Sequence, residues 1–227
     1  MPIPEAVIFD MDGVLIDSEP IHIQIEKNLF YNLGIEVSDA VHRSYMGASN
    51  EFMYADLRSR FQLSDSVKVL IERDELYRSD YFNGLDCIPL NKGIIHLLNE
   101  IKSAGLKMAV ATSSSVKITD ILLNQCGIAS LFDAIVTTAE AGKSKPSPEV
   151  YLLAAQRIGV LPGNCIVFED SPNGLKSAKS AGMYCVVIQS DDLVLQELTK
   201  ADFFIHSFRE ITASKLFSLF SSNKIAN

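Results

Sequence analysis

Short apolar runs alternate along the chain with segments of helical periodicity. Each run is bounded by glycine, proline or acidic residues, which is typical of buried strands. The segments between them carry apolar residues three or four positions apart and end at Gly105, Gly127 and Gly159, where a left-handed helix cap favours glycine. Continuous apolar strands joined by helices indicate a mostly parallel sheet covered on both faces. The predicted strands are Ala6–Phe9, Met108–Ala111, Ala134–Val136, Ile166–Phe168, Tyr184–Ile188 and Phe203–Ile205.

One connection is too long for this pattern. About 80 residues separate the first strand from the next helical segment of the core, whereas a βαβ unit needs about 30 residues in all and a structureless loop of such length is rare in a compact domain. The stretch has helical patterning of its own, over Ser49–Phe61, over Ser66–Tyr81 and after Ser18. We therefore predict an α/β fold in which residues 1–16 and 84–227 form the parallel-sheet core and residues 17–83 form an inserted α-helical cap domain.

Charge and hydropathy exclude several classes of protein. The 227-residue chain has a net charge of −8, which argues against nucleic-acid binding through neutralised phosphates. No apolar stretch reaches the roughly 18 residues of a membrane span, and acidic residues interrupt the apolar N-terminus, so neither a membrane protein nor a secretory signal is expected. The four cysteines form no CxxC pair and have no zinc spacing. We expect a cytoplasmic protein without a membrane or nucleic-acid partner, whose polar tail Ser218–Asn227 frays.

Polar side chains follow four of the predicted strands. Taken singly, each has a local explanation, such as an Asp-Gly turn or a helix cap. In an open parallel sheet, however, ligands bind outside the carboxyl ends of the strands, and all of these groups fall at that edge. They are Asp10 and Asp12 after the first strand, Thr112 to Ser114 after the second, Lys145 after the third, and Glu169 with Asp170 after the fourth.

This set of groups suits phosphoryl transfer. Several carboxylates packed together repel one another unless a cation compensates them, and oxygen ligands suit Mg2+. Lys145 and the Thr112 hydroxyl suit the oxygens of a phosphoryl group. A carboxylate can also serve as the nucleophile and form an aspartyl-phosphate.

In their order along the chain, these residues resemble the four motifs of the haloacid dehalogenase superfamily. The motifs are Asp10-Met-Asp12-Gly13-Val14, Thr112, Lys145-Pro146 and Glu169-Asp170. The stretches Asp17-Ser18-Glu19, Lys145-Pro-Ser-Pro-Glu149 and Glu169-Asp-Ser-Pro-Asn-Gly174 are similar to the branch that contains β-phosphoglucomutase and small sugar-phosphate phosphatases. The resemblance covers nearly the whole chain and implies a Rossmann-like core with a helical cap.

The resemblance also implies a role for each matching residue. Asp10 would be the nucleophile, and Asp12 would protonate the leaving oxygen and then deprotonate water. The phosphoryl oxygens would be held by Thr112, Ser113 and Lys145. Mg2+ would be held by Asp10, Asp12 through its backbone carbonyl, Asp170, and Glu169 directly or indirectly. Because the dehalogenases and phosphonoacetaldehyde hydrolases lack an acid at the position of Asp12, the sequence favours phosphate esters over halides and phosphonates.

The cap is expected to exclude water and to set specificity. His22 resembles a cap histidine of the β-phosphoglucomutase branch, and residues 45–50 resemble its specificity loop. Where the mutase carries a lysine and an arginine in that loop, this chain has Met46 and Asn50. Arg73 aligns roughly with a basic cap residue. We name His22, Asn50 and Arg73 as candidate substrate-binding residues of the cap.

The leading hypothesis is a monomeric, Mg2+-dependent phosphatase acting on a small phosphorylated metabolite, most simply a sugar phosphate. The alternative is a phosphosugar mutase of the β-phosphoglucomutase type, which lacks its two loop cations here. Two further classes fit less well. A phosphorylatable receiver module has its acid pair first in the chain and no cap, and a non-catalytic protein would not explain why every catalytic position is filled.

Overall fold

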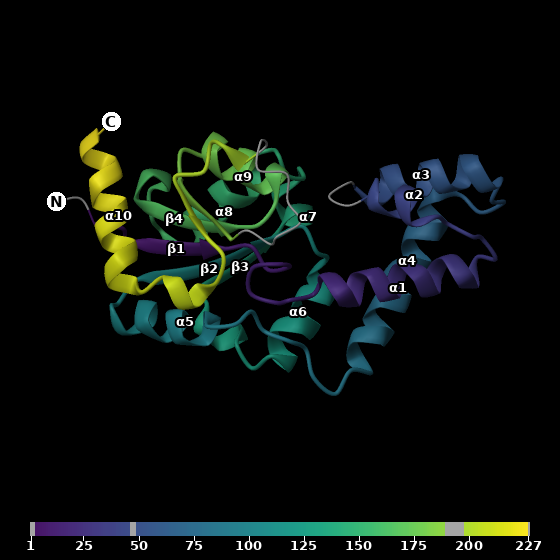
Figure 1. Cartoon of the computed structure of the whole chain (residues 1–227), viewed down its shortest axis with the longest axis horizontal. Helices are drawn as coiled ribbons and strands as arrows, with labels where there is room; N and C mark the ends of the chain where they lie inside the picture. Colours follow the sequence, from purple (N-terminus) through teal and green to yellow (C-terminus); the bar gives the residue numbers. More distant parts are fainter. Residues whose placement is uncertain (1–2, 46–48, 189–197, 227) are drawn as a thin grey trace. The chain divides into compact units, whose positions relative to one another are not determined.

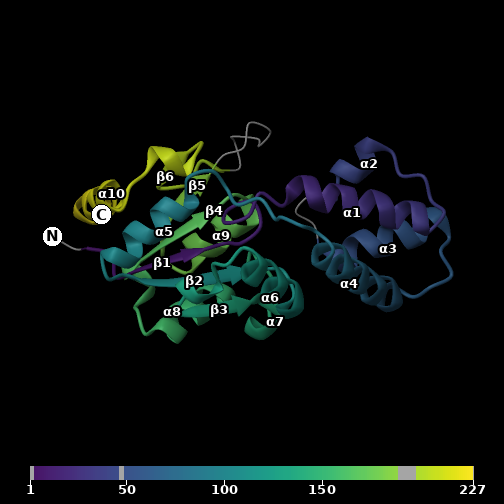
Figure 2. The same ribbon diagram turned by 90° about the horizontal axis from the view of Figure 1, so that it is seen from below.

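The chain folds into two compact units, one formed by Met1–Ser18 with Cys87–Asn227 and the other by Glu19–Asp86. They are described from a computed structural model, which describes residues 3–45, 49–188 and 198–226, with the backbone alone at 224–226. Figures 1 and 2 show the course of the chain in each unit.

The first unit, here called the core, contains a six-stranded parallel sheet in the order β3-β2-β1-β4-β5-β6 (Figure 2). The predicted α/β class is thereby confirmed. Three strands have the predicted bounds and three extend further, because the hydrophobic pattern leaves out polar end residues such as Thr112 and Glu169. The strands are β1 Ala6–Phe9, β2 Lys107–Thr112, β3 Ala134–Thr137, β4 Cys165–Glu169, β5 Tyr184–Ile188 and β6 Phe203–Ile205.

Helices cover both faces of the sheet, as Figure 1 shows for α8 and α9 on one face and α5 on the other. On the first face, Ile8, Ala109 and Tyr151 belong to one fully buried apolar cluster. On the other, Phe9 stacks on Phe168 with ring centroids 5.2 Å apart. This alternation is the two-residue period of a strand. The helices are α5 Ile94–Ser103, α6 Val116–Gln125, α7 Thr138–Ala141, α8 Glu149–Ile158, α9 Pro172–Ser180 and α10 Ala213–Ala226, with short 3-10 turns at Ala129–Leu131, Pro162–Asn164 and Phe208–Glu210.

The prediction of a frayed tail was wrong. Helix α10 spans Ala213–Ala226, and the side chains of Leu216 and Phe220 are fully buried. Phe220 packs edge-on against Tyr184 of β5, with ring centroids 5.8 Å apart. Phe220 therefore anchors the polar segment that was expected to fray, and Leu216 anchors the preceding turn of the same helix.

The second unit is here called the cap, and its described residues form four helices: α1 Glu19–Asn32, α2 Asp39–Arg43, α3 Asn50–Phe61 and α4 Val67–Asn83. Ser49 and Ser66 cap α3 and α4, because each hydroxyl accepts a hydrogen bond from the backbone N–H three residues later. The apolar centre of the cap is formed by Phe30, Tyr45, Met53, Tyr54, Leu57 and Leu70. The short helix α2 has no periodic signal long enough to predict it.

The two connections to the cap run side by side where they leave the core. Asp17 N donates to Pro89 O at 2.9 Å, and Ile16 forms an isolated antiparallel bridge with Leu90. Asn91 Nδ2 donates to the carbonyls of Gly13 and Val14, both at 2.8 Å. The segment that returns from the cap therefore holds the loop after β1 in place. Among the described residues, no helix is both long and apolar enough to cross a membrane.

Candidate active site

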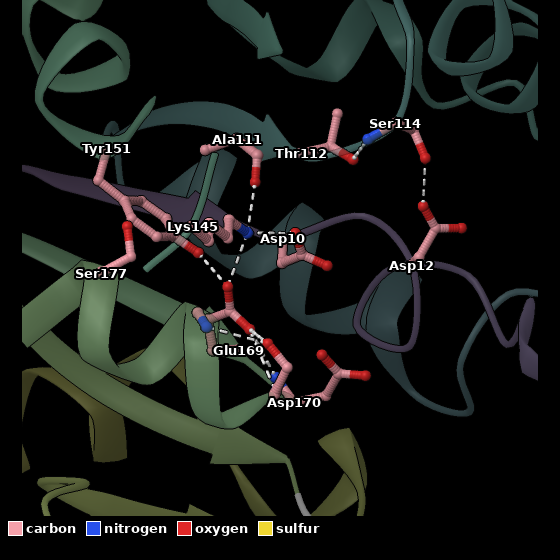
Figure 3. Close-up of polar contacts among 12 residues, drawn as sticks. Asp10, Asp12, Ala111, Thr112, Ser114, Lys145, Tyr151, Glu169, Asp170 and Ser177 are labelled. Carbon is pink, nitrogen blue, oxygen red and sulfur yellow. Dashed lines mark hydrogen bonds and ion pairs between the residues drawn. The ribbon is translucent and has the colours of Figure 1, made fainter. Parts of the chain in front are cut away.

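The polar residues that follow the strands meet at one edge of the sheet (Figure 3). Parallel register explains the meeting, since Phe9 of β1 pairs with Val110 of β2 and with Phe168 of β4. The three strands consequently end at the same level. Asp10, Thr112 and Glu169 lie at or just beyond these ends, so the ends of the strands bring the three side chains together.

Lys145 lies at the centre of this group. Its ammonium donates to Asp10 Oδ1 at 2.5 Å, to Glu169 Oε1 at 2.7 Å and to the carbonyl of Ala111 at 3.1 Å. It also lies 4.9 Å from the centre of the Tyr151 ring. Burial opposes the charged form of Lys145, but the charges of Asp10 and Glu169 prevail and raise its pKa. Lys145 is thus a cation fixed beside Asp10.

Glu169 is fully buried, and both of its carboxylate oxygens accept hydrogen bonds. Oε1 accepts from Lys145 and from the hydroxyl of Tyr151, the latter at 2.5 Å. Oε2 accepts from the backbone N–H groups of Asp170 and Ser171 and from the Ser171 hydroxyl. Burial raises the pKa of Glu169, but Lys145 and the other donors outweigh it and hold that pKa below its usual value. Glu169 therefore acts as an ionised anchor for Lys145 and for the loop after β4.

Asp10, Glu169 and Asp170 each offer a carboxylate oxygen, and these atoms lie within 4.8 Å of one another. Burial, opposed by Lys145, raises the pKa of Asp10 to about 8. Burial and the charges of Glu169 and Asp10 raise the pKa of Asp170 well above its usual value. A divalent cation at this cluster would favour the ionised forms, and the all-oxygen donor set suits Mg2+.

Asp12 is held apart from that cluster by two hydroxyl groups. Ser18 donates to Asp12 Oδ1 and Ser114 donates to Oδ2, each at 2.7 Å. Gly13, which follows Asp12, has a φ of 77°, and a side chain there would meet Asp170 Oδ2. The positive φ lets the chain turn directly after Asp12, and the missing side chain leaves room for the Asp170 carboxylate.

The residues assigned to phosphate binding lie close to the carboxylates of the site. Thr112 is the last residue of β2, is almost fully buried, and accepts a hydrogen bond from Ser114 N at 3.0 Å. Ser113 is exposed. Thr112 and Ser113 lie at the end of β2, which flanks β1, and Lys145 reaches Asp10 from the loop between α7 and α8. Their assignment to phosphoryl oxygens is a proposal.

The candidate cap residues lie in different surroundings. His22, in the first turn of α1, is partly buried and contacts Arg78. Asn50 is exposed and donates to Asp74 at 3.4 Å. Arg73 is exposed and pairs with Asp65 at 2.5 Å. The Met46 position of the predicted specificity loop lies outside the described residues.

Three residues that hold these groups were not predicted. Tyr151 anchors Glu169, Asn91 fixes the loop after β1, and Arg78 binds His22. Tyr151 and Arg78 lie on helices, where a lone polar atom gives no sequence signal. The Asn91-Lys-Gly93 turn before α5 is the one place where a local pattern hinted at a fixed loop.

The Tyr151 hydroxyl provides a stability prediction. Replacing Tyr151 with Phe removes a donor from a buried carboxylate, and we expect this to lower the free energy of unfolding by about 2 kcal/mol. Chemical denaturation of Tyr151→Phe beside Tyr31→Phe measures the difference, because the Tyr31 side chain is 83% exposed. Equal stability of the two variants would show that Tyr151 does not support Glu169.

Several known proteins are similar to this chain in both sequence and fold. The family model described as haloacid dehalogenase-like hydrolase matches residues 7–188. The chain is 34% identical to a phosphorylated carbohydrates phosphatase from Thermotoga maritima, over 79% of this chain and 82% of the relative. It is 31% identical to fructose-1-phosphate phosphatase YqaB from Escherichia coli, over 81% and 95% respectively.

Among solved structures, β-phosphoglucomutase from Clostridium difficile superposes with a TM-score of 0.83, covering 98% of this chain and all of that one, at 24% identity. That likeness shows the fold. The family model and the phosphatase from Thermotoga maritima each match most of the chain. The chain therefore belongs to the haloacid dehalogenase-like hydrolase family.

Proposed function

We propose that this chain is a Mg2+-dependent phosphatase of small phosphomonoesters, sugar phosphates in particular, and that it acts through an aspartyl-phosphate on Asp10. It is a phosphoric monoester hydrolase, consistent with its family and with the names of its relatives. The observation that carries the proposal is the contact of Lys145 with Asp10 and Glu169 at the end of the sheet. A fixed cation beside a buried carboxylate suits attack on an anionic phosphoryl group.

The chemistry assigns one step to each of two carboxylates. An Asp10 oxygen attacks phosphorus, the bond from phosphorus to the ester oxygen breaks, and Asp12 gives its proton to the departing oxygen. Water then attacks the phosphorus of the aspartyl-phosphate, Asp12 accepts a proton from that water, and Asp10 is regenerated as phosphate leaves. Lys145 and Thr112 hold the phosphoryl oxygens during both steps.

The residues present fit a bound Mg2+. Asp10 and Asp170 would hold it, with the Asp12 carbonyl, whereas Glu169 already accepts hydrogen bonds at both oxygens and fits an indirect role. When bound, Mg2+ supplies positive charge that offsets the repulsion between carboxylates and phosphate.

Ser18 and Ser114 each donate a hydrogen bond to Asp12 and orient its carboxylate, which supports the proposed proton exchange. An acid at this position favours oxygen leaving groups, which need a proton, and this supports ester substrates.

The mutase alternative is not favoured. The two relatives of 31% and 34% identity are named as phosphatases of phosphorylated carbohydrates, and the loop cations of the mutase are replaced here by Met46 and Asn50. Water is therefore proposed as the acceptor of the phosphoryl group.

The test is phosphate release from a panel of phosphorylated sugars, nucleotides and small acids, with Mg2+ and with EDTA. We expect release from sugar phosphates with Mg2+, a loss of at least about 100-fold with EDTA, and recovery when Mg2+ is restored in excess. Full activity in EDTA would contradict the metal requirement.

The same reactions distinguish the two functions. Wells that contain β-glucose 1-phosphate are assayed for glucose 6-phosphate as well as for inorganic phosphate. Glucose 6-phosphate without phosphate release would replace the phosphatase by the mutase.

A further inference from the structure

One asparagine supports the loop that carries Asp12. Asn91 lies in the segment that leads into α5, and its side chain donates from Nδ2 to the carbonyls of Gly13 and Val14, both at 2.8 Å. Its backbone N–H donates to the carbonyl of Leu15 at 3.0 Å. An amide NH2 group has two hydrogens, so both side-chain bonds can form together. Asn91 therefore provides the donors for three successive carbonyl groups of one loop.

That loop, residues 11–17, depends on these donors. It turns back on itself, since Leu15 N donates to Met11 O at 2.9 Å. Val14 is fully buried, so little water can replace a donor that its carbonyl loses. Because an unpaired buried carbonyl is unfavourable, removal of the Asn91 amide should rearrange the loop.

The backbone of the loop determines where the Asp12 carboxylate lies. Asp12 directly precedes Gly13, the first residue whose carbonyl Asn91 holds. The hydroxyl groups of Ser18 and Ser114 donate to the two oxygens of Asp12, each at 2.7 Å (Figure 3 shows the second contact). Hydrogen bonds weaken steeply when distance and angle change, so both contacts require the backbone in this place. A shift of the loop would therefore displace the proposed acid.

Asp10 is held in a different way. Its backbone N–H donates to the carbonyl of Phe168 at 3.0 Å, which continues the pairing of β1 with β4. Its carboxylate accepts from Lys145, which also contacts Glu169. These contacts do not pass through Asn91, so its loss should move the acid and leave the nucleophile in place.

We propose that Asn91 is a positioning residue for proton transfer by Asp12. The inference rests on the proposed phosphatase function, in which Asp12 gives its proton to the ester oxygen as the bond from phosphorus to that oxygen breaks. The alkoxide of a sugar or polyol needs this proton, whereas nitrophenolate is stable enough to leave without one. Asn91 should therefore matter strongly for alkyl phosphates and little for activated aryl phosphates.

The kinetic test compares kcat/KM for the best sugar phosphate of the panel with kcat/KM for p-nitrophenyl phosphate, at saturating Mg2+. This constant covers the steps up to departure of the leaving group, so hydrolysis of the aspartyl-phosphate does not affect it. Asn91→Leu should lower the value for the sugar phosphate at least about tenfold and the value for the aryl phosphate less than about threefold. Asn91→Asp should lower their ratio as much, because it keeps the shape of the side chain but not the donor.

The matched control is Asn124→Leu. The Asn124 side chain is exposed on α6, and its Nδ2 donates to the carbonyl of Asp120 at 2.8 Å. The control loses the same kind of hydrogen bond outside the site and should keep both values. An equal fall for the two substrates in Asn91→Leu, or no fall, would overturn the role in proton transfer while leaving the phosphatase proposal intact.

Hydrogen exchange gives a second readout that needs neither substrate nor metal. In Asn91→Leu we expect faster exchange of the backbone amides of residues 11–17 and unchanged exchange in β4. Unchanged exchange in the loop, or an equal rise in both segments, would show that Asn91 does not hold the loop specifically. If the wild-type protein hydrolyses no ester, the proposed function and the role of Asn91 fail together.

Discussion

Asp10→Asn is expected to reduce phosphate release by at least about 10⁴-fold while leaving the protein folded. The amide is nearly the same size as the carboxylate, but it is a poor nucleophile and carries no charge for Lys145 or a metal ion. Because Asp10 is buried and accepts from Lys145 at 2.5 Å, the substitution weakens one ion pair, and Lys145 keeps its contact with Glu169. Phosphate release under saturating substrate measures the loss, and circular dichroism checks the fold.

The matched control is Asp120→Asn, an exposed position on α6. It makes the same chemical change outside the site and should keep wild-type activity. A folded Asp10→Asn protein with more than about a hundredth of wild-type activity would end the proposal that Asp10 is the nucleophile. Trapping of phosphate on the wild-type protein after acid quenching, absent in Asp10→Asn, would identify the intermediate.

The sequence predicted the sheet better than the cap because strands and helices leave different traces. A parallel strand buried on both faces appears as a continuous apolar run, and β1, β5 and β6 have the predicted bounds. Helix α2 spans five residues and is stabilised by the Ser38 cap, so it shows no hydrophobic period. In α10, the fully buried Phe220 outweighs the polar average of the segment from Ser218, and composition alone misled the prediction.

In the candidate site, too, residues at strand ends could be predicted and residues on helices could not. Asp10, Thr112 and Glu169 could be found because each lies at the end of a strand or directly after it, and parallel register brings strand ends together. Tyr151, in the first turn of α8, reaches Glu169 only through the packing of that helix on the sheet. Arg78 contacts Glu26 across a sequence separation of 52 residues. Such pairings depend on which helices are neighbours, and one sequence does not encode that in a local pattern.

Arg73 and Arg78 show most clearly what the sequence alone could not predict. Both lie on α4 and both are basic, and a rough alignment with the mutase chose Arg73. The helix turns Arg73 outward to Asp65 and Arg78 inward to Glu26 and Asp74. Five residues are about 500° of helical rotation, so the two side chains lie on different sides, and only the packing of α1 against α4 determines which side is buried.

Gly174→Ala is expected to destabilise the protein by about 2–4 kcal/mol and to remove most of its activity. The sign is unusual, because alanine normally stabilises a helix relative to glycine by about 1 kcal/mol, and Gly174 lies in α9. A Cβ built at Gly174, however, would lie 1.8 Å from Glu169 Oε1 and 2.1 Å from Oε2. That carboxylate has no free space to enter, because it is fully buried and held by Lys145, Tyr151 and Ser171. Making room for the methyl group must break some of these hydrogen bonds, and Lys145 then loses the anchor that places it beside Asp10.

Two comparisons make this prediction specific to Glu169. Gly84→Ala lies at the end of α4, where an added Cβ meets its nearest atoms at an ordinary 3.5 Å, and it should change stability by less than about 1 kcal/mol. In a Glu169→Asp background the shorter side chain withdraws from Gly174, so the cost of Gly174→Ala should shrink, and a double-mutant cycle of urea denaturation measures that coupling. Additive effects of the two substitutions would show that the methyl group harms the protein by another route. If the two substitutions are coupled both in the free energy of unfolding and in the rate of phosphate release, Gly174 is required for a steric reason. The buried carboxylate of Glu169 then occupies the space that a side chain at Gly174 would need.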